Sequence, residues 1–249
     1  MWSSDFLTKY APESLEEMVL NKDTRSEVQN FINAGKVCIL TDKDVSYGKT
    51  LLAMLMFETL LNKKSQTGTA PYDLYERSII PADFTDFSTY EVPDTEVILL
   101  TGVGGRNMSA EQQRLLFDKI KSKDGTVIIT TDDIDTVIPE IRDFADTVII
   151  PAEPSDSDVL AYLKNICKAE NVELSDEIFN EILNYGKRMS MLRIHKRRLT
   201  SYVREIFTML HHIIYMTEFN TAEDIRRFMD RRYQSVISKT GQSTEVSNG

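Results

Sequence analysis

The sequence has little cysteine and lacks long apolar runs. Its two cysteines, Cys38 and Cys167, lie far apart inside apolar segments, without the paired spacing of a metal site or a disulfide framework. We therefore expect two buried thiols. No apolar stretch approaches the length of a membrane span, and the N-terminal letters MWSSDFLTKY do not resemble a signal peptide. These absences indicate a soluble, intracellular protein of the cytoplasm with no membrane partner.

Acidic residues outnumber basic ones: the chain has 39 Asp and Glu but only 29 Lys and Arg, which gives a formal net charge of -10. This balance excludes nucleic-acid binding through the whole surface, although a local basic patch can still form. One stretch without an acid carries seven cations, Lys187, Arg188, Arg193, Lys196, Arg197, Arg198 and Arg204. We expect a helix from Ser190 to about Tyr215, with Arg193, Arg197 and Arg204 on one face. That face could contact DNA phosphates or an acidic partner; alternatively, it is a solvated helix balanced by its acidic neighbours.

Short apolar runs rich in β-branched residues alternate with segments of helical periodicity. The runs are 37–40, 97–100, 126–130 and 147–150, with 77–80 as a weaker fifth. Continuous apolar strands between helices are typical of a parallel sheet covered on both faces. The sequence therefore predicts an α/β domain with a five-stranded parallel sheet over residues 1–151.

After Pro151 the pattern is helical. Ser155 can cap a helix running to about Glu170, and Ser175 opens the next one. We expect a small all-helical domain over residues 152–215 and a further helical segment over 216–237. The polar tail, residues 238–249, lacks an apolar face and is expected to be disordered.

The stretch TDKDVSYGKT, residues 41–50, ends like a phosphate-binding loop. Such a loop needs small residues whose N–H groups turn toward the phosphates, a lysine for the outer phosphates and a hydroxyl for Mg²⁺. Gly48, Lys49 and Thr50 supply its end, between a strand and a helix. Lys43 stands where the first glycine is expected, and Ser46 and Tyr47 replace small residues. The alternative is an ordinary strand-to-helix turn.

These features, with the opening WSSDFLTKYAPESLEEMVLN, resemble the AAA+ ATPases of the clamp-loader type, that is, replication factor C small subunits and their bacterial and phage equivalents. Trp2, Lys9, Tyr10, Pro12 and Leu15 match the N-terminal box of that family. The resemblance implies an AAA+ sheet followed by a helical lid, and ATP or ADP with Mg²⁺ as the cofactor. It also implies that Tyr10 and Pro12 lie against the adenine and that the Thr50 hydroxyl coordinates the Mg²⁺ ion.

The resemblance continues to about Phe207. Gln113, Leu115 and Leu116 match the helix after the Walker B strand, and Thr130-Thr-Asp-Asp133 falls where relatives place a sensor Thr-Asn. Arg193 has roughly the position of the lid arginine that touches the nucleotide. The partners implied are other AAA+ clamp-loader or replisome subunits, a sliding clamp or helicase, and DNA, in a nucleoid or nuclear setting.

The catalytic positions depart from the family. Hydrolysis needs an aspartate that binds Mg²⁺ and a glutamate that orients the attacking water. Both would follow the predicted strand 97–100, where the sequence reads Thr101-Gly102. Asp132 and Asp133 are the candidate substitute acids. The trans-acting arginine is replaced by Asp143-Phe-Ala145, with Arg142 two residues before the expected place. No catalytic residue is therefore assigned, and we expect degenerate Walker motifs and little or no turnover.

Three interpretations follow from the sequence. The first is a clamp-loader-like subunit in DNA replication that binds nucleotide weakly and hydrolyses it poorly or not at all. The second is an AAA+ scaffold or helicase-loader protein that binds a replication partner without an ATP cycle. In each case, the candidate contacts to nucleic acid or a partner are Arg188, Lys196, Arg197, Arg198 and Arg204. The third is an active helicase loader in which Asp132 or Asp133 replaces the missing acids. Only about forty residues follow the lid, which argues against a full clamp-loader collar domain.

Overall fold

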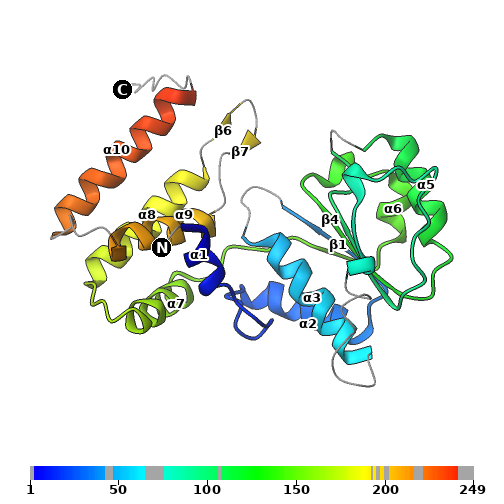
Figure 1. Ribbon diagram of the computed structural model, residues 1–249, viewed down its shortest axis with the longest axis horizontal. Helices are drawn as coiled ribbons and strands as arrows, with labels where there is room; N and C mark the ends of the chain where they lie inside the picture. The colour runs from blue at the N-terminus through cyan, green and yellow to red at the C-terminus, as the bar shows by residue number, and fades with distance from the viewer. Residues whose placement is uncertain are drawn as a thin grey trace. The chain divides into compact units, whose positions relative to one another are not determined.

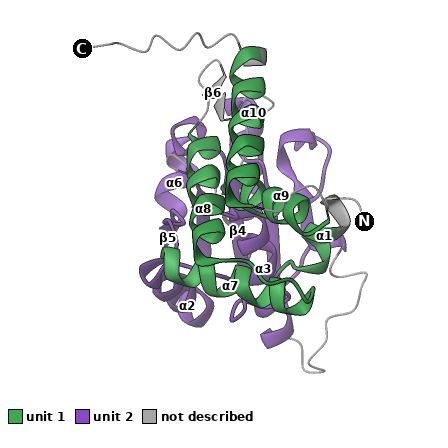
Figure 2. Cartoon of the chain, turned by 90° about the vertical axis from the view of Figure 1, so that its left-hand side faces the viewer, with its two compact units in different colours: residues 1–11, 155–249 green, residues 12–154 purple. Residues whose placement is uncertain are grey.

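The computed structural model describes residues 3–42, 47–64, 76–105, 108–191, 193–194, 197–198, 202–215 and 221–240. The chain forms two compact units (Figures 1 and 2). The sheet unit comprises Pro12–Pro154, and the helical unit comprises Met1–Ala11 with Ser155–Gly249. The N-terminal residues thus group with the helices, whereas we expected them in the sheet domain.

The sheet unit contains a parallel sheet with the strand order β2-β3-β4-β1-β5. The strands are β1 (Val37–Thr41), β2 (Ile79–Pro81), β3 (Val97–Thr101), β4 (Thr126–Thr131) and β5 (Thr147–Ile149). All five predicted strands are present, although the weak candidate at 77–80 forms β2 only from Ile79, because residues 76–78 are helical. The predicted five-stranded parallel sheet is therefore confirmed.

Helices cover both faces of this sheet (Figure 1). They are α2 (Lys22–Ala34), α3 (Lys49–Lys64), α5 (Ala110–Ile120) and α6 (Pro139–Phe144), with the short turns η1 (Ala82–Phe84) and η2 (Ile134–Thr136). Side chains alternate along each strand. Cys38 and Leu40 join the core under α2 and α3, whereas Val37 and Ile39 join the core under α5 and α6.

The helical unit consists of α1 (Ser3–Lys9), α7 (Asp156–Ala169), α8 (Asp176–Ser190), α9 (Tyr202–Tyr215) and α10 (Ala222–Thr240), with a hairpin of β6 (Arg193–Ile194) and β7 (Arg197–Arg198). Ser155 and Ser175 cap α7 and α8 as predicted, because their hydroxyls accept from the amides of Asp158 and Ile178 at 3.1 and 3.4 Å. The α8 and α9 helices approach closely at Gly186. A Cβ there would lie 2.5 Å from Ile206 Cγ1.

Two expectations about this unit were wrong. The chain does not form one helix from Ser190 to Tyr215, because α8 ends at Ser190 and the β6-β7 hairpin precedes α9. Like charges one helical turn apart, such as Arg193 and Arg197, repel each other and disfavour a helix there. The helix α10 also runs to Thr240, so residues 238–240 are helical; the rest of the expected disordered tail lies outside the described residues.

Both cysteines are free and buried, as predicted. Burial raises the pKa of the Cys38 thiol to about 12 and that of the Cys167 thiol to about 11, which leaves both thiols protonated near neutral pH. Across the helices that the structure describes, none has the length and apolar character needed to cross a bilayer.

Candidate phosphate-binding site

The end of the predicted phosphate loop lies at the carboxyl edge of the sheet. Strand β1 ends at Thr41 and helix α3 begins at Lys49, so the N-terminus of α3 opens toward that edge and provides a favourable place for an anion. Gly48 has a φ of 89°, in the region that glycine adopts without strain. The Thr50 side chain is exposed. The predicted strand-loop-helix setting is confirmed, and residues 43–46, with Lys43, lie outside the described residues.

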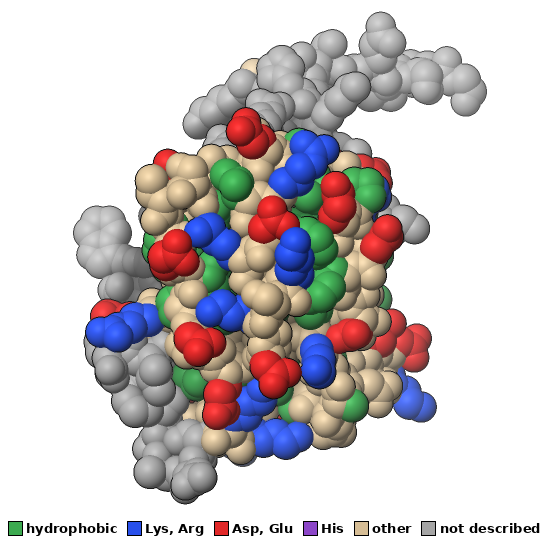
Figure 3. All heavy atoms as spheres, turned by 90° about the vertical axis from the view of Figure 1, so that its right-hand side faces the viewer, with side chains coloured by type: hydrophobic (Ala, Val, Ile, Leu, Met, Phe, Trp, Pro, Cys, Tyr) green, Lys and Arg blue, Asp and Glu red, His purple; other side chains and the backbone are tan. Residues whose placement is uncertain are grey.

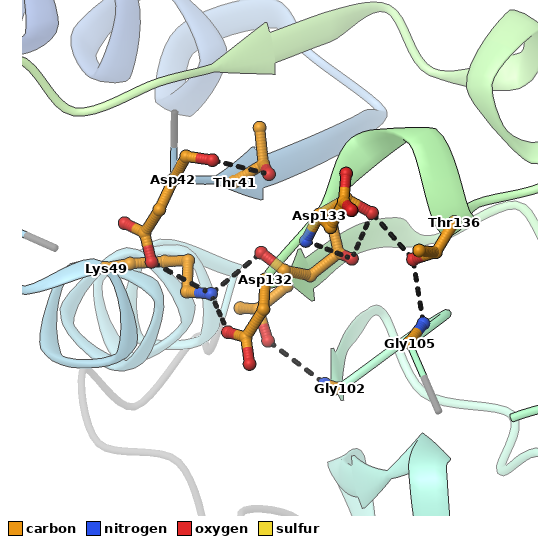
Figure 4. A network of polar contacts seen from close by, with 10 residues as sticks. Thr41, Asp42, Lys49, Gly102, Gly105, Asp132, Asp133 and Thr136 are labelled. Atoms are coloured by element: carbon orange, nitrogen blue, oxygen red, sulfur yellow. Dashed lines mark hydrogen bonds and ion pairs between the residues drawn. The ribbon is translucent and has the colours of Figure 1, made fainter. Parts of the chain in front are cut away.

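Lys49 is buried and makes its contacts within the chain (Figure 4). Its Nζ donates to the Thr131 carbonyl at 2.7 Å and to Asp132 Oδ1 at 2.5 Å, and lies 3.2 Å from Asp42 Oδ2. These three acceptors match the N–H donors of one ammonium group. A phosphate oxygen could reach Lys49 Nζ only by displacing one of them.

Strand register explains why two aspartates meet at Lys49. β1 and β4 are parallel neighbours, with Thr41 opposite Thr131. The residues that follow these strands, Asp42 and Asp132, therefore emerge at the same edge of the sheet. We had predicted Asp132 as an acid near the site but had overlooked Asp42. Its position directly after β1, matching that of Asp132 after β4, was the available signal.

Asp133 is placed differently from Asp132. Its side chain caps η2 by accepting from the Asp135 amide at 3.0 Å, and its carbonyl accepts from the Thr136 hydroxyl at 2.7 Å. Thr136 Oγ1 in turn accepts from the Gly105 amide at 2.7 Å (Figure 4). Asp133 therefore supports the loop after β3, while Asp132 contacts the lysine.

The end of β3 lacks an acidic side chain, as the sequence indicated. Gly102 follows Thr101 with a φ of 76°, and its amide donates to Thr130 Oγ1 at 3.2 Å. A Cβ on Gly102 would lie 2.8 Å from the carboxyl carbon of Asp83. This acid in η1, which we had not predicted, is brought to β3 because β2 pairs with it, with Pro81 opposite Thr101.

The donor set does not fit an Mg²⁺ ion held through a β3 carboxylate. Hard cations of this kind prefer carboxylate oxygens, and the two positions after the apolar part of β3 are Thr101 and Gly102. The described part of the chain holds no cluster of three or more His, Cys, Asp or Glu side chains suited to a metal. The hydroxyl of Thr50 stays a predicted metal donor only.

Tyr47 and Arg142 also lie in the sheet unit. The Tyr47 hydroxyl donates to Glu153 Oε2 at 3.4 Å. Arg142, near the end of α6, lies 4.0 Å from Asp135 Oδ1. Its use as a trans-acting arginine stays a prediction.

Tyr10 belongs to the helical unit, where α1 packs on α9. Glu170 accepts from Lys9 Nζ at 2.7 Å, from the Tyr10 hydroxyl and from the Tyr215 hydroxyl at 2.8 Å. The Lys9 ammonium, followed by the Tyr10 hydroxyl, lowers the pKa of Glu170 to about 2. Tyr162 donates its hydroxyl to the Tyr10 carbonyl. The roles of Tyr10 and Pro12 at an adenine stay predictions.

The predicted basic face is divided between three elements. Arg188, on α8, lies 3.1 Å from Asp230 Oδ1 and stacks 4.3 Å from the centre of the Tyr233 ring. Arg193 and Arg198 stand opposite each other in the β6-β7 hairpin, whereas Arg204 is exposed on α9. Lys196 lies outside the described residues. We had expected Arg193, Arg197 and Arg204 to share one helical face. They do not, because they lie in β6, β7 and α9.

One face of the molecule, seen from the right-hand side of Figure 1, shows Lys and Arg side chains interspersed with Asp and Glu (Figure 3). In the sheet unit, ion pairs join Lys119 to Glu91 at 3.3 Å and Lys123 to Asp94 at 3.5 Å. The described residues of this face form no single-sign patch of the kind that binds a polyanion.

Comparison with known proteins supports the fold. No protein-family model matches the sequence, and no curated protein matches it. Among solved structures, the RuvB Holliday junction branch migration motor of Thermotoga maritima is similar with a TM-score of 0.56 at 12% identity, over 91% of this chain and 73% of RuvB. The replication initiator DnaA bound to AMPPCP and single-stranded DNA is similar with a TM-score of 0.56 at 16% identity, over 93% of this chain and 70% of the DnaA chain.

A chain of the E. coli MS115-1 HORMA:CdnC:Trip13 complex is similar with a TM-score of 0.52 at 13% identity, over 92% of this chain and 81% of that one. RuvB, DnaA and Trip13 are AAA+ ATPases. At these identities the similarity is one of fold. The parallel sheet, the helices on both its faces and the C-terminal helical region give this chain the fold of the AAA+ ATPases.

Proposed function

We propose that this chain is a clamp-loader-type AAA+ subunit of a DNA-replication assembly, which binds nucleotide weakly and does not hydrolyse it. One observation carries the proposal. Lys49 is held by Asp42 and Asp132 at a sheet edge where β3 ends without a carboxylate. The lysine suited to phosphate binding is thus retained but internally paired, and a side chain that could activate water is missing after β3.

The chemistry of phosphoryl transfer supports the absence of turnover. Catalysis depends on positioning and on charge stabilisation by Mg²⁺, its carboxylate ligand and a residue that orients the attacking water. Removing one preorganised catalytic group typically lowers the rate by about 10²–10³-fold. Thr101 and Gly102 supply neither carboxylate, so the expected rate lies far below that of a working ATPase.

The link to DNA comes from the resemblance and from the helical unit. RuvB is described as a Holliday junction branch migration motor, and DnaA as a replication initiator bound to single-stranded DNA. In this chain, the β6-β7 hairpin and its joining residues carry four cations, Arg193, Lys196, Arg197 and Arg198. A cationic hairpin of this kind suits DNA phosphates.

The contacts of Lys49 also favour a second candidate function, a scaffold that binds a replication partner without nucleotide. Asp42 and Asp132 give the lysine a counter-charge inside the chain, so the fold can satisfy its buried cation without a phosphate. The two functions differ in one measurable property, which is the binding of ATP.

Calorimetric titration of the purified protein with ATP and Mg²⁺, beside a hydrolysis assay on the same sample, tests the proposal. Weak ATP binding without turnover supports the clamp-loader-type function, and co-purification with an active ATPase would identify the assembly. No binding at millimolar ATP supports the scaffold function. DNA-stimulated turnover would contradict both and favour the active helicase loader, in which Asp132 or Asp133 replaces the missing acids.

A further inference from the structure

The two acids at Lys49 differ in exposure. The Asp42 side chain is 14% exposed and the Asp132 side chain is 97% exposed, while that of Lys49 is 6% exposed. Asp132 nevertheless touches the buried ammonium (Figure 4). The lysine is therefore reached from solvent on the side where Asp132 lies, and Asp42 holds it from within.

We infer that Asp132 is an internal anion that takes the place of a phosphate group on Lys49, and that a ligand with a di- or triphosphate binds Lys49 by displacing Asp132. This inference deepens the proposed function and rests on it, since it assumes that the loop ending in Lys49 accepts a nucleotide. It makes Asp132 the residue that sets the affinity of the site.

The chemistry of the contacts selects Asp132 as the group that leaves. Carboxylate and phosphate oxygens both accept charge-assisted hydrogen bonds from an ammonium group. The Thr131 carbonyl is fixed within β4, and the Asp42 carboxylate is mostly buried, so moving it away from Lys49 is costly. Asp132 is almost fully exposed, so its carboxylate is rehydrated when it leaves Lys49. Among the three acceptors of Lys49, Asp132 is therefore the least costly to displace.

Competition by Asp132 also explains how a retained lysine can give weak binding. Because Asp132 is tethered next to Lys49, it competes at an effective concentration of about millimolar or above. While it stays on Lys49, its charge also repels an incoming phosphate. Both effects lower the apparent affinity for nucleotide and leave the lysine in place.

A pair of isosteric variants tests this inference. Asp132→Asn removes the competing charge and keeps the side-chain shape. Asp133→Asn is the matched control, because it removes a charge one residue away and keeps an oxygen that can cap η2 through the Asp135 amide. Each variant is titrated by calorimetry with ATP and, separately, with inorganic pyrophosphate, after circular dichroism has shown native helix content.

We expect Asp132→Asn to bind both ligands at least about tenfold more tightly than the unmodified chain, from the loss of one nearby like charge. Asp133→Asn should stay within about twofold, because its carboxylate is engaged at η2. Adding Lys49→Met to Asp132→Asn should remove the gain. The inference is overturned if Asp132→Asn binds no more tightly than the unmodified chain, if Asp133→Asn gains equally, or if neither binds either ligand.

The two hypotheses fail in different ways. Turnover by the unmodified chain would contradict the proposed function, while the affinity ratio between Asp132→Asn and the unmodified chain would still decide the inference. Weak binding without turnover, together with an unchanged ratio, would overturn the inference alone.

Discussion

A Cβ atom on Gly102 would lie 2.8 Å from the carboxyl carbon of Asp83. The φ of Gly102, 76°, is also one that other residues adopt only with strain. A side chain at the position after β3 that would orient the attacking water is therefore strained by the backbone, and it also requires the Asp83 carboxylate to move aside. The backbone conformation of the loop thus disfavours an acid here.

We predict that the double substitution Thr101→Asp with Gly102→Glu does not restore ATP hydrolysis, because a glutamate side chain at position 102 would be strained and crowded by Asp83. Gly102→Ala should lower the free energy of unfolding by about 1–3 kcal/mol, mainly from the φ, with a smaller part from the displacement of the Asp83 carboxylate. Urea unfolding measures this loss. Gly105→Ala is the matched control, since Gly105 has a φ of 71° and open space around its Cβ position.

Gly105→Ala should lower the free energy of unfolding by about 1–2 kcal/mol, which is the cost of the backbone conformation alone. Equal losses in Gly102→Ala and Gly105→Ala would show that Asp83 does not crowd position 102. Measurable turnover by the double variant would show that the loop accepts a catalytic acid.

A second prediction concerns stability without nucleotide. Lys49→Met should lower the free energy of unfolding by about 2–3 kcal/mol, because it removes a buried ammonium that faces the mostly buried Asp42 carboxylate. Adding Asp42→Asn should recover part of this loss. Chemical unfolding of the nucleotide-free protein gives both values.

Lys121→Met provides the comparison for Lys49→Met. Lys121 lies 2.5 Å from Asp118 Oδ1, and their side chains are 50% and 62% exposed. Its loss should cost less than about 0.5 kcal/mol. If Lys49→Met proves equally mild, Lys49 is not needed to neutralise Asp42.

The contact of Glu170 with Lys9 gives a pH prediction. The pKa of Glu170 is lowered to about 2, below its unfolded value of about 4.3. A lowered pKa contributes stability that is present above the unfolded value and is lost as pH falls toward the folded value. Glu170→Gln should therefore lower Tm at pH 7, and the difference from the unmodified chain should shrink between about pH 5 and pH 2.

Thermal melts over this pH range, followed by circular dichroism, test the role of Glu170. Glu181→Gln is a suitable comparison, because Glu181 pairs with Arg226 at 2.8 Å outside the α1 contact. A Tm difference for Glu170→Gln that stays constant down to pH 2 would contradict the prediction.

A fourth prediction concerns the cationic hairpin. Replacing Arg197 and Arg198 together by Ala should weaken binding to single-stranded or primed DNA. It should also lower the salt dependence of the affinity, by about one unit of slope for each phosphate that is no longer neutralised. Arg226→Ala is the control, because Arg226 is already paired with Glu177 and Glu181. Fluorescence anisotropy at several salt concentrations measures the effect, and an equal weakening in Arg226→Ala would argue against DNA binding by the hairpin.

Much of the fold could be predicted from sequence, because its signals are local. The β-branched runs predicted the strands, and Ser155 and Ser175 marked helix starts through their capping side chains. The β6-β7 hairpin was missed because its residues continued an apparent helical pattern.

The site could be predicted only in part, because its contacts are set by strand order. The sequence located Lys49 and drew attention to Asp132, but the meeting of Asp42, Lys49 and Asp132 depends on β1 and β4 being neighbours. Asp83 was overlooked for the same reason, since only the pairing of β2 with β3 brings it to Gly102.

The most direct test of the proposed function is ATP turnover by the unmodified chain at saturating ATP and Mg²⁺, with and without primed DNA. Lys49→Met, purified in the same way, corrects for contaminating ATPase. We predict equal rates for the two proteins, indistinguishable from background. A rate of about 1 s⁻¹ or more that disappears in Lys49→Met, in the range of ordinary enzymes, would contradict the proposal and show that another acid replaces the one missing from β3.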